Sequence, residues 1–170
     1  VASQLWLFLA LVIDALAIAG QAMIGPLLSS GQPARARAVA NRLLQLGLVL
    51  GLGLAAMMGL LSGVLPRIFT DDPMVLAAVD GVFWFVVLMQ PLNALVFVWD
   101  GIGIGASAFR YLAGSMFAAA LAAIAVLLAV LPLGAGLPMV WWALTLLMFL
   151  RVGAMTWWHV RGPLKRPAVA

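Results

Sequence analysis

Apolar residues fill five long stretches of this chain, and most polar residues lie in the short segments between them. The stretches cover residues 5–25, 43–65, 74–99, 111–131 and 139–160. A helix needs about 20 mostly apolar residues to cross a bilayer, because the hydrocarbon layer is about 30 Å thick and a helix rises about 1.5 Å per residue. The pattern therefore predicts an all-α integral membrane protein with five transmembrane helices surrounded by membrane lipid.

The composition agrees with this class and argues against several others. Hydrophobic residues make up 66% of the chain and charged residues 8%, and there is no cysteine, which excludes disulfides and thiol chemistry within it. The single histidine, His159, has no partners for a metal site, so we expect no metal and no cofactor. The net charge of +4 does not indicate nucleic-acid binding, because the basic residues lie at the ends of the apolar stretches.

The basic residues also predict the topology. They follow the first, third and fifth stretches, at Arg35, Arg37, Arg42, Arg110, Arg161, Lys165 and Arg166. If five helices alternate in direction, these residues share one side, and the other side carries Arg67 beside Asp71 and Asp72. Short loops rich in Lys and Arg stay in the cytoplasm, so we expect residues 163–170 to form a cytoplasmic tail and Val1 to lie outside. A further helix upstream would explain an outside start, and we interpret the chain as a fragment.

Local motifs predict where some helices begin and end. Asp72 is suited to cap free amides and Pro73 to the first turn of a helix. Prolines and glycines at residues 132–138 predict a turn. The three glycines of residues 100–105 follow a membrane helix and not a strand, so we expect a flexible cytoplasmic end there and no phosphate-binding loop. Paired tryptophans bracket the last stretch and predict an interfacial aromatic belt, at Trp141, Trp142, Trp157 and Trp158.

Asp14 lies near the middle of the first stretch, where an ionisable residue is costly. Hydrocarbon penalises the charged form of a carboxylate, so a residue at this depth is suited to bind and release a proton. Gln21 is seven residues further on, so the two side chains share one face of the helix. We therefore take Asp14 as a proton-coupling candidate and Gln21 as a cavity-lining candidate. The alternative for Asp14 is a structural hydrogen bond or an ion pair with Arg151.

Two further groups of polar residues lie inside the predicted membrane helices. Gln90 and Asn93 flank Pro91, which removes a backbone hydrogen bond and favours a kink. We take both amides as cavity-lining candidates, with a packed kink as the alternative. Arg151 interrupts the last stretch, and its permanent charge requires water or an acidic partner, for which Asp14 and Asp100 are available. We expect a structural ion pair and take Asp100 and Arg151 as charge-balance candidates.

Three strings of residues are similar to segments of a known family. Residues 14–22, followed by Gly25, resemble the eighth helix of multidrug and toxic compound extrusion (MATE) transporters, and most closely the branch called DNA-damage-inducible protein F (DinF). Phe69-Thr70-Asp71-Asp72-Pro73 resembles the outer loop before that family's tenth helix. The tenth helix itself resembles Gln90-Pro91-Leu92-Asn93-Ala94 together with Phe97, Asp100, Gly101 and Gly105.

The resemblance implies a transporter of twelve helices in two six-helix lobes around a V-shaped cavity. Residues 1–162 would then form most of the second lobe, and its partners would be the missing N-terminal lobe and the missing first helix of its own lobe. Family members export small organic cations or amphipathic drugs across the plasma membrane by antiport. The sodium-coupled branch has a carboxylate where this chain has Asn93, so we expect a proton gradient to drive transport, and we expect the fragment alone to be inactive.

Three alternatives remain at this point. A lipid flippase of the same superfamily, with a lipid-linked saccharide as substrate, would need a strongly basic cavity. A membrane enzyme acting on lipid phosphates would need clustered acidic metal ligands, and Asp71 and Asp72 are the only adjacent acidic pair. A non-transporting assembly subunit would leave Asp14 and Arg151 unexplained. We therefore expect a transporter and not an enzyme.

Overall fold

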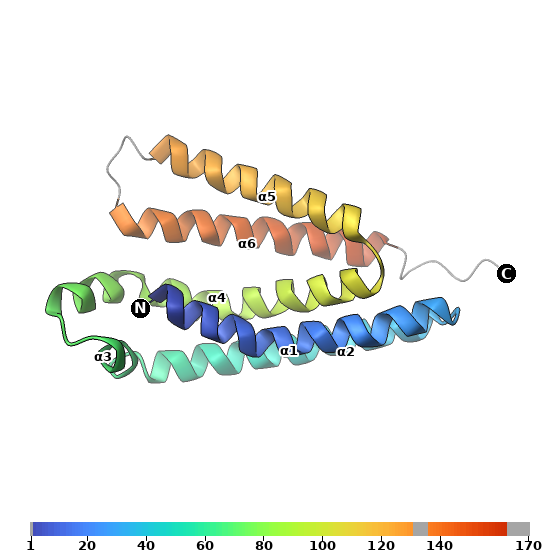
Figure 1. The fold of residues 1–170 in the computed structure, drawn as a ribbon, viewed down its shortest axis with the longest axis horizontal. Helices are drawn as coiled ribbons and strands as arrows, with labels where there is room; N and C mark the ends of the chain where they lie inside the picture. Colours follow the sequence, from blue (N-terminus) through green and yellow to red (C-terminus); the bar gives the residue numbers. More distant parts are fainter. Residues whose placement is uncertain (1, 131–135, 163–170) are drawn as a thin grey trace.

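The computed structural model describes residues 2–130 and 136–162, and these are almost entirely helical (Figure 1). The helices are α1 (Ala2–Ser29), α2 (Pro33–Leu60), α3 (Leu65–Phe69), α4 (Pro73–Gly105), α5 (Phe109–Val130) and α6 (Gly136–Arg161). Five of them, all except the short α3, are long and apolar enough to cross a membrane. The prediction of an all-α protein with five transmembrane helices is therefore confirmed.

Several helix boundaries differ from the predicted stretches. The helix α2 begins at Pro33 and not at residue 43, and α4 continues to Gly105, so the segment 100–105 is helical where we predicted a flexible end. Hydropathy identifies the part of a helix that lies in hydrocarbon. It does not detect helical turns that continue into the polar regions outside the hydrocarbon. In the first turns of α2, for example, Ala36 and Ala40 are buried, while Arg35 faces outward and donates to Gln32 Oε1 at 2.8 Å.

The connections between the helices are only partly as predicted. Asp72 caps α4 as expected: its Oδ1 accepts a hydrogen bond of 2.8 Å from the backbone N–H of Met74. The short helix α3, just before this cap, was not predicted, because five residues carry no clear periodicity. The predicted turn over residues 132–138 lies mostly outside the described residues, and its last three residues already belong to α6. The predicted tail, residues 163–170, also lies outside the described part of the chain.

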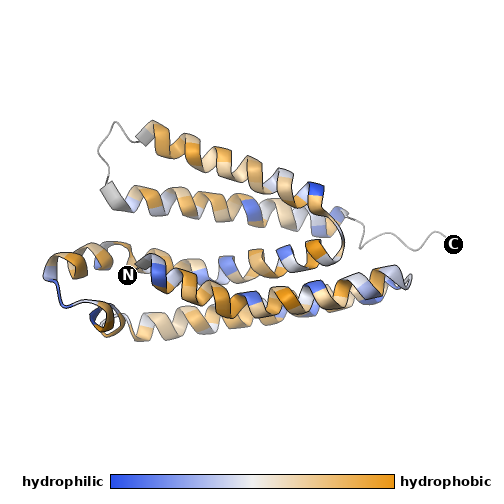
Figure 2. Cartoon of the chain, viewed as in Figure 1, coloured by the Kyte–Doolittle hydropathy of each residue, from blue (hydrophilic) through white to orange (hydrophobic). Residues whose placement is uncertain are grey.

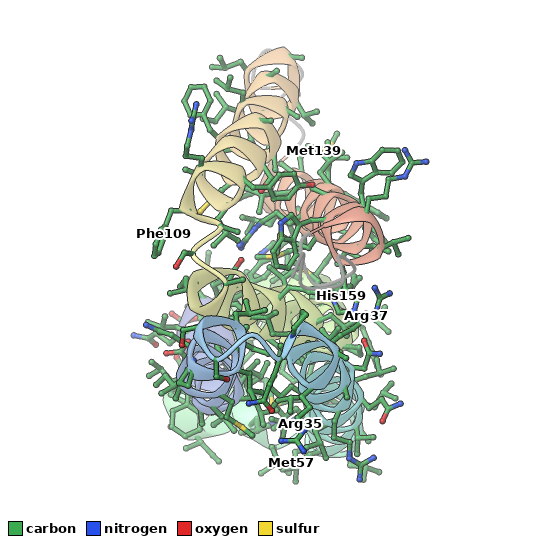
Figure 3. All side chains as sticks on the ribbon, turned by 90° about the vertical axis from the view of Figure 1, so that its right-hand side faces the viewer. Arg35, Arg37, Met57, Phe109, Met139 and His159 are labelled. Carbon is green, nitrogen blue, oxygen red and sulfur yellow. The ribbon has the colours of Figure 1, made fainter. Side chains whose placement is uncertain are left out.

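The five long helices form two layers. Figure 1 shows α1, α2 and α4 on one side and the α5–α6 hairpin on the other, and Figure 3 shows the same division from the end of the bundle. The helix α4 is central, because it packs against α1, α2 and α6, whereas α5 packs mainly against α6. Two apolar clusters follow the length of the bundle, and α4 contributes to both of them. The position of α4 therefore determines how the other helices meet.

The connections alternate between the two ends of the bundle, as the sequence predicted. The α1–α2 turn, the α4–α5 turn and the end of α6 lie together at one end, while α3 and the start of α1 lie at the other (Figure 1). Hydrophilic residues gather at the ends, and isolated ones occur along otherwise apolar helices (Figure 2). We call the end with the α1–α2 and α4–α5 turns the arginine-rich end, because Arg35, Arg37, Arg110 and Arg161 lie there.

Glycines allow α4 to approach its neighbours closely. A Cβ atom on Gly101 would overlap the backbone of Ala17 in α1. A Cβ atom on Gly51 of α2 would lie only 2.7 Å from Pro91 Cα and 2.8 Å from the carbonyl oxygen of Gln90 in α4. Small residues at such crossings allow backbones to pack closely where lipid supplies no hydrophobic driving force. The glycine of residue 101, predicted to be in a flexible segment, is therefore a helix-packing residue.

We expect Gly101→Ala to destabilise the folded protein, because the added methyl forces α1 and α4 apart. Overpacking of this kind costs about 1–3 kcal/mol. The matched control is Gly81→Ala in the same helix, where an added Cβ meets nothing within 4 Å and the gain in helix propensity makes it neutral or slightly stabilising. Thermal unfolding of the purified whole protein would compare the two variants, and equal midpoints would contradict the close contact.

Candidate functional site

A cavity of about 290 Å³ lies between α1 and α4, and it contains two of the sequence-predicted acidic residues. Its walls are Asp14, Ala17, Ile18 and Gln21 from α1 and Phe97, Asp100, Gly101 and Ile104 from α4. Both sets follow the spacing i, i+3, i+4, i+7, which places four residues on one face of a helix. The contact between Gly101 and Ala17 lies within these walls. The cavity therefore lies beside a close approach of the two helix backbones.

The carboxylate of Asp100 forms a salt bridge with Arg151 of α6. Arg151 Nη2 donates to Asp100 Oδ1 at 2.6 Å and also to Oδ2. The arginine side chain is 10% exposed and the aspartate side chain 26% exposed. The sequence left Asp14 and Asp100 as possible partners of Arg151, and in the structure the partner is Asp100. The pair links α6 to α4 and compensates a charge that would be very costly alone in hydrocarbon.

Asp14 differs from Asp100 in its surroundings. It is half-buried on the cavity wall, and no cation forms an ion pair with it within residues 2–130 and 136–162. Gln21, two turns further along α1, lines the same cavity with an exposed side chain. The predicted shared face of Asp14 and Gln21 is therefore present, and it opens into a space that also contains Asp100. Sequence reasoning did not identify Phe97 and Ile104 as cavity residues, although their spacing from Asp100 was enough to do so.

Gln90 and Asn93 occupy a different environment, in the interior of the helix layer. Both side chains are fully buried, and neither is among the residues that line this cavity. Gln90 Nε2 donates to the carbonyl oxygen of Val86 at 2.8 Å, one turn before Pro91. The Oε1 atom of Gln90 and both amide atoms of Asn93 have no hydrogen-bond partner among the described residues. Neither side chain lines the α1–α4 cavity in this structure, and their participation in a cavity of the whole protein remains a prediction.

The tryptophans of α6 separate into two pairs that differ from the predicted belt. Trp142 and Trp157 are more than half exposed and are suited to anchoring at an interface. Trp141 and Trp158 are buried and pack inside the bundle. Trp141 also lines a second cavity, of about 680 Å³, whose largely apolar walls come from α1, α4 and α6 at the end opposite the arginine-rich end. Hydropathy alone does not show which member of such a pair faces the core.

The charged site contains no arrangement suited to a bound metal. Within the described residues, no group of three or more His, Cys, Asp or Glu side chains lies close enough to hold an ion. The two carboxylates of the cavity differ in charge compensation, because Asp100 is paired with Arg151 and Asp14 has no cationic partner in the described part of the chain. Of the two, Asp14 is therefore the carboxylate without an ion-pair partner among the described residues.

These features define a multi-pass membrane protein with a charged site inside its helix bundle. Residues 1–131 match the family model described as MatE. The chain belongs to this family, whose members are transporters and not enzymes.

Curated relatives agree. The chain is 41% identical to Protein DETOXIFICATION 42 of Arabidopsis thaliana over 154 residues, which cover 91% of this chain and 30% of that protein. It is 38% identical to Protein DETOXIFICATION 43 of the same plant, over 87% of this chain and 28% of that protein. Protein DETOXIFICATION 45, chloroplastic, is 37% identical, over 89% of this chain and 27% of that protein. The chain thus spans less than a third of each relative's length. No solved structure matches the chain significantly.

We expect Arg151→Leu to destabilise the whole protein by up to about 3 kcal/mol, the lower end of the range for breaking a buried ion pair. We expect a loss of stability at this lower end because Asp100 is partly exposed, so its unpaired charge would still be hydrated in part. The double variant Asp100→Asn, Arg151→Gln should recover most of the loss, because it removes both charges together. Thermal unfolding midpoints would test this, and a single variant as stable as the original protein would show that the pair contributes little.

Proposed function

We propose that this chain is part of a secondary active efflux transporter that exchanges organic cations or amphipathic compounds for protons. The observation that carries the proposal is the position of Asp14, a half-buried carboxylate on a cavity wall without a cationic partner among the described residues. In a low-dielectric site, a proton and an organic cation compete for such a charge. Binding of one therefore favours release of the other, which is the requirement for antiport.

The other cavity residues suit a cationic, partly apolar solute. Phe97, Ile18 and Ile104 supply apolar surface, and Gln21 supplies a hydrogen-bonding amide. A volume of about 290 Å³ is at the small end for a drug-sized ligand. The proposal therefore includes a second wall from elsewhere in the longer protein, and it treats this chain as inactive alone. MATE membership and relatives named DETOXIFICATION support efflux as the direction of transport.

Finer assignments belong to the same proposal. The resemblance of residues 14–25 to the DinF branch supports placing the chain in the C-terminal lobe, with the arginine-rich end in the cytoplasm and the protein in the plasma membrane. Asn93 in place of a carboxylate supports protons over sodium as the coupling ion.

The flippase alternative is weaker, because a lipid-linked saccharide carries phosphate and needs basic groups in its cavity. Both charged residues in the walls of the α1–α4 cavity are acidic, and the nearby Arg151 is already paired with Asp100. A non-transporting subunit would have no need of an unpaired intramembrane carboxylate. Of these functions, proton-coupled efflux is the one that accounts for both the unpaired Asp14 and the paired Asp100.

We expect Asp14→Asn, made in the whole protein, to abolish the dependence of drug efflux on the proton gradient, because asparagine is of similar size and does not ionise. Efflux of a fluorescent organic cation from inverted vesicles, measured over a range of pH, would test this. Asp80→Asn is the matched control, since Asp80 is exposed near the opposite end of α4 and its removal should leave the pH profile unchanged. An unchanged profile for Asp14→Asn would reject Asp14 as the coupling residue.

A further inference from the structure

His159 makes a direct polar contact between two helices that are far apart in the chain. Its Nε2 lies 2.7 Å from Oδ1 of Asn41, which joins α6 to α2 at the arginine-rich end. The imidazole is 8% exposed, and Trp99 of α4 packs edge-on against it, with ring centroids 6.4 Å apart. No partner of His159 was predictable from the sequence, because a contact across 118 residues leaves no local pattern. The proposed transport site does not use this contact.

The chemistry of Asn41 Oδ1 determines which nitrogen of the imidazole carries the proton in this contact. An amide oxygen accepts hydrogen bonds and does not donate them, so Nε2 carries the proton that it donates to Asn41. In the neutral imidazole, Nδ1 is then an acceptor, and it is buried without a partner among the described residues. A second proton on Nδ1 would therefore create a buried charged donor with no acceptor facing it. The arrangement favours the neutral ring.

The charged side chains around His159 also favour the neutral imidazole. Arg37, one turn before Asn41 on α2, lies close enough for its charge to act on the imidazole, and the two residues are neighbours when the bundle is viewed end-on (Figure 3). On α6, Arg161 lies over the ring of Trp157, and on α5 the hydroxyl of Tyr111 donates to the carbonyl oxygen of Ala154 at 2.6 Å. Neither supplies a negative charge.

The acidic residues of the chain offer no compensation either. On α4, Asp100 is held by Arg151. The other carboxylates lie on α1 or towards the opposite end, at Asp14, Asp71, Asp72 and Asp80. Within residues 2–130 and 136–162, an imidazolium at position 159 would therefore face a cation and no free anion.

We propose that His159 and Asn41 form a proton-sensitive latch between α6 and α2: the latch is closed while the imidazole is neutral and opens when it is protonated. Trp99, which packs against the imidazole, belongs to an apolar cluster with Met155 and Trp158, so a charged ring would be poorly hydrated while the helices stay in contact. Asn41 is exposed, so its amide can exchange the imidazole for water when the latch opens. The latch senses the pH at the arginine-rich end, and it does not depend on the proposed role of Asp14.

The test follows the separation of α2 and α6 in the whole protein as the pH changes. The chain has no cysteine of its own, so cysteines introduced at the exposed Ala38 and Val160 can carry spin labels without competing sites in this region. Any cysteines elsewhere in the longer protein would first be replaced. Distances measured by electron paramagnetic resonance from about pH 8 to about pH 5, the range in which imidazole titrates, should shift to longer values in acid.

Three variants distinguish a latch from a general effect of acid. His159→Gln keeps a donor but does not ionise, so its distances should stay short at every pH. Asn41→Leu removes the acceptor and should give long distances already at neutral pH. Arg37→Gln removes the neighbouring charge and should move the opening to higher pH, whereas Arg161→Gln, the matched control on α6, should not.

Two outcomes would overturn the latch. A pH-dependent separation that persists in His159→Gln would assign the change to another group. A separation that does not change with pH in the unaltered protein would show that the contact is purely structural. Because the readout is a distance and not transport, failure of the proposed antiport would leave this result unaffected.

Discussion

The fold depends on the close approach of α4 to its neighbours. At Gly101 the backbone of α4 lies against Ala17 of α1, and at Gly51 the backbone of α2 lies against the Gln90–Pro91 turn of α4. In a membrane, the hydrophobic effect does not drive helices together, so packing of this kind and polar contacts must do so. The salt bridge between Asp100 and Arg151 adds the α5–α6 hairpin to this three-helix layer. The two layers are thus joined through α4.

Much of this architecture was predictable from the sequence, because the bilayer imposes a simple rule on segment length and polarity. The number of spanning helices, their alternation and the Asp72 cap were all predicted correctly. Hydropathy did not locate the start of α2, the end of α4 or the helix α3, since none of these is defined by a run of apolar residues. It also could not separate Trp141 from Trp142, which differ in the face they occupy and not in their chemistry.

The candidate site was predictable residue by residue but not as an arrangement. Asp14 and Arg151 stood out because charges within apolar stretches are rare, and the face shared by Asp14 and Gln21 followed from helical periodicity. The choice of Asp100 as the partner of Arg151 required the three-dimensional contact between α4 and α6. The full burial of Gln90 and Asn93 likewise depends on which faces of α4 meet the neighbouring helices.

The contact between Gly101 and Ala17 also limits how the molecule can move. With no side chain between them at this crossing, α1 and α4 have no clearance to slide or rotate past one another without breaking their closest contact. We therefore expect α1 and α4, which carry Asp14 and Asp100, to move together as one rigid unit, or strut, with the cavity on one side of it. Access to the cavity would then be governed by whatever faces this strut, and not by a parting of its two members.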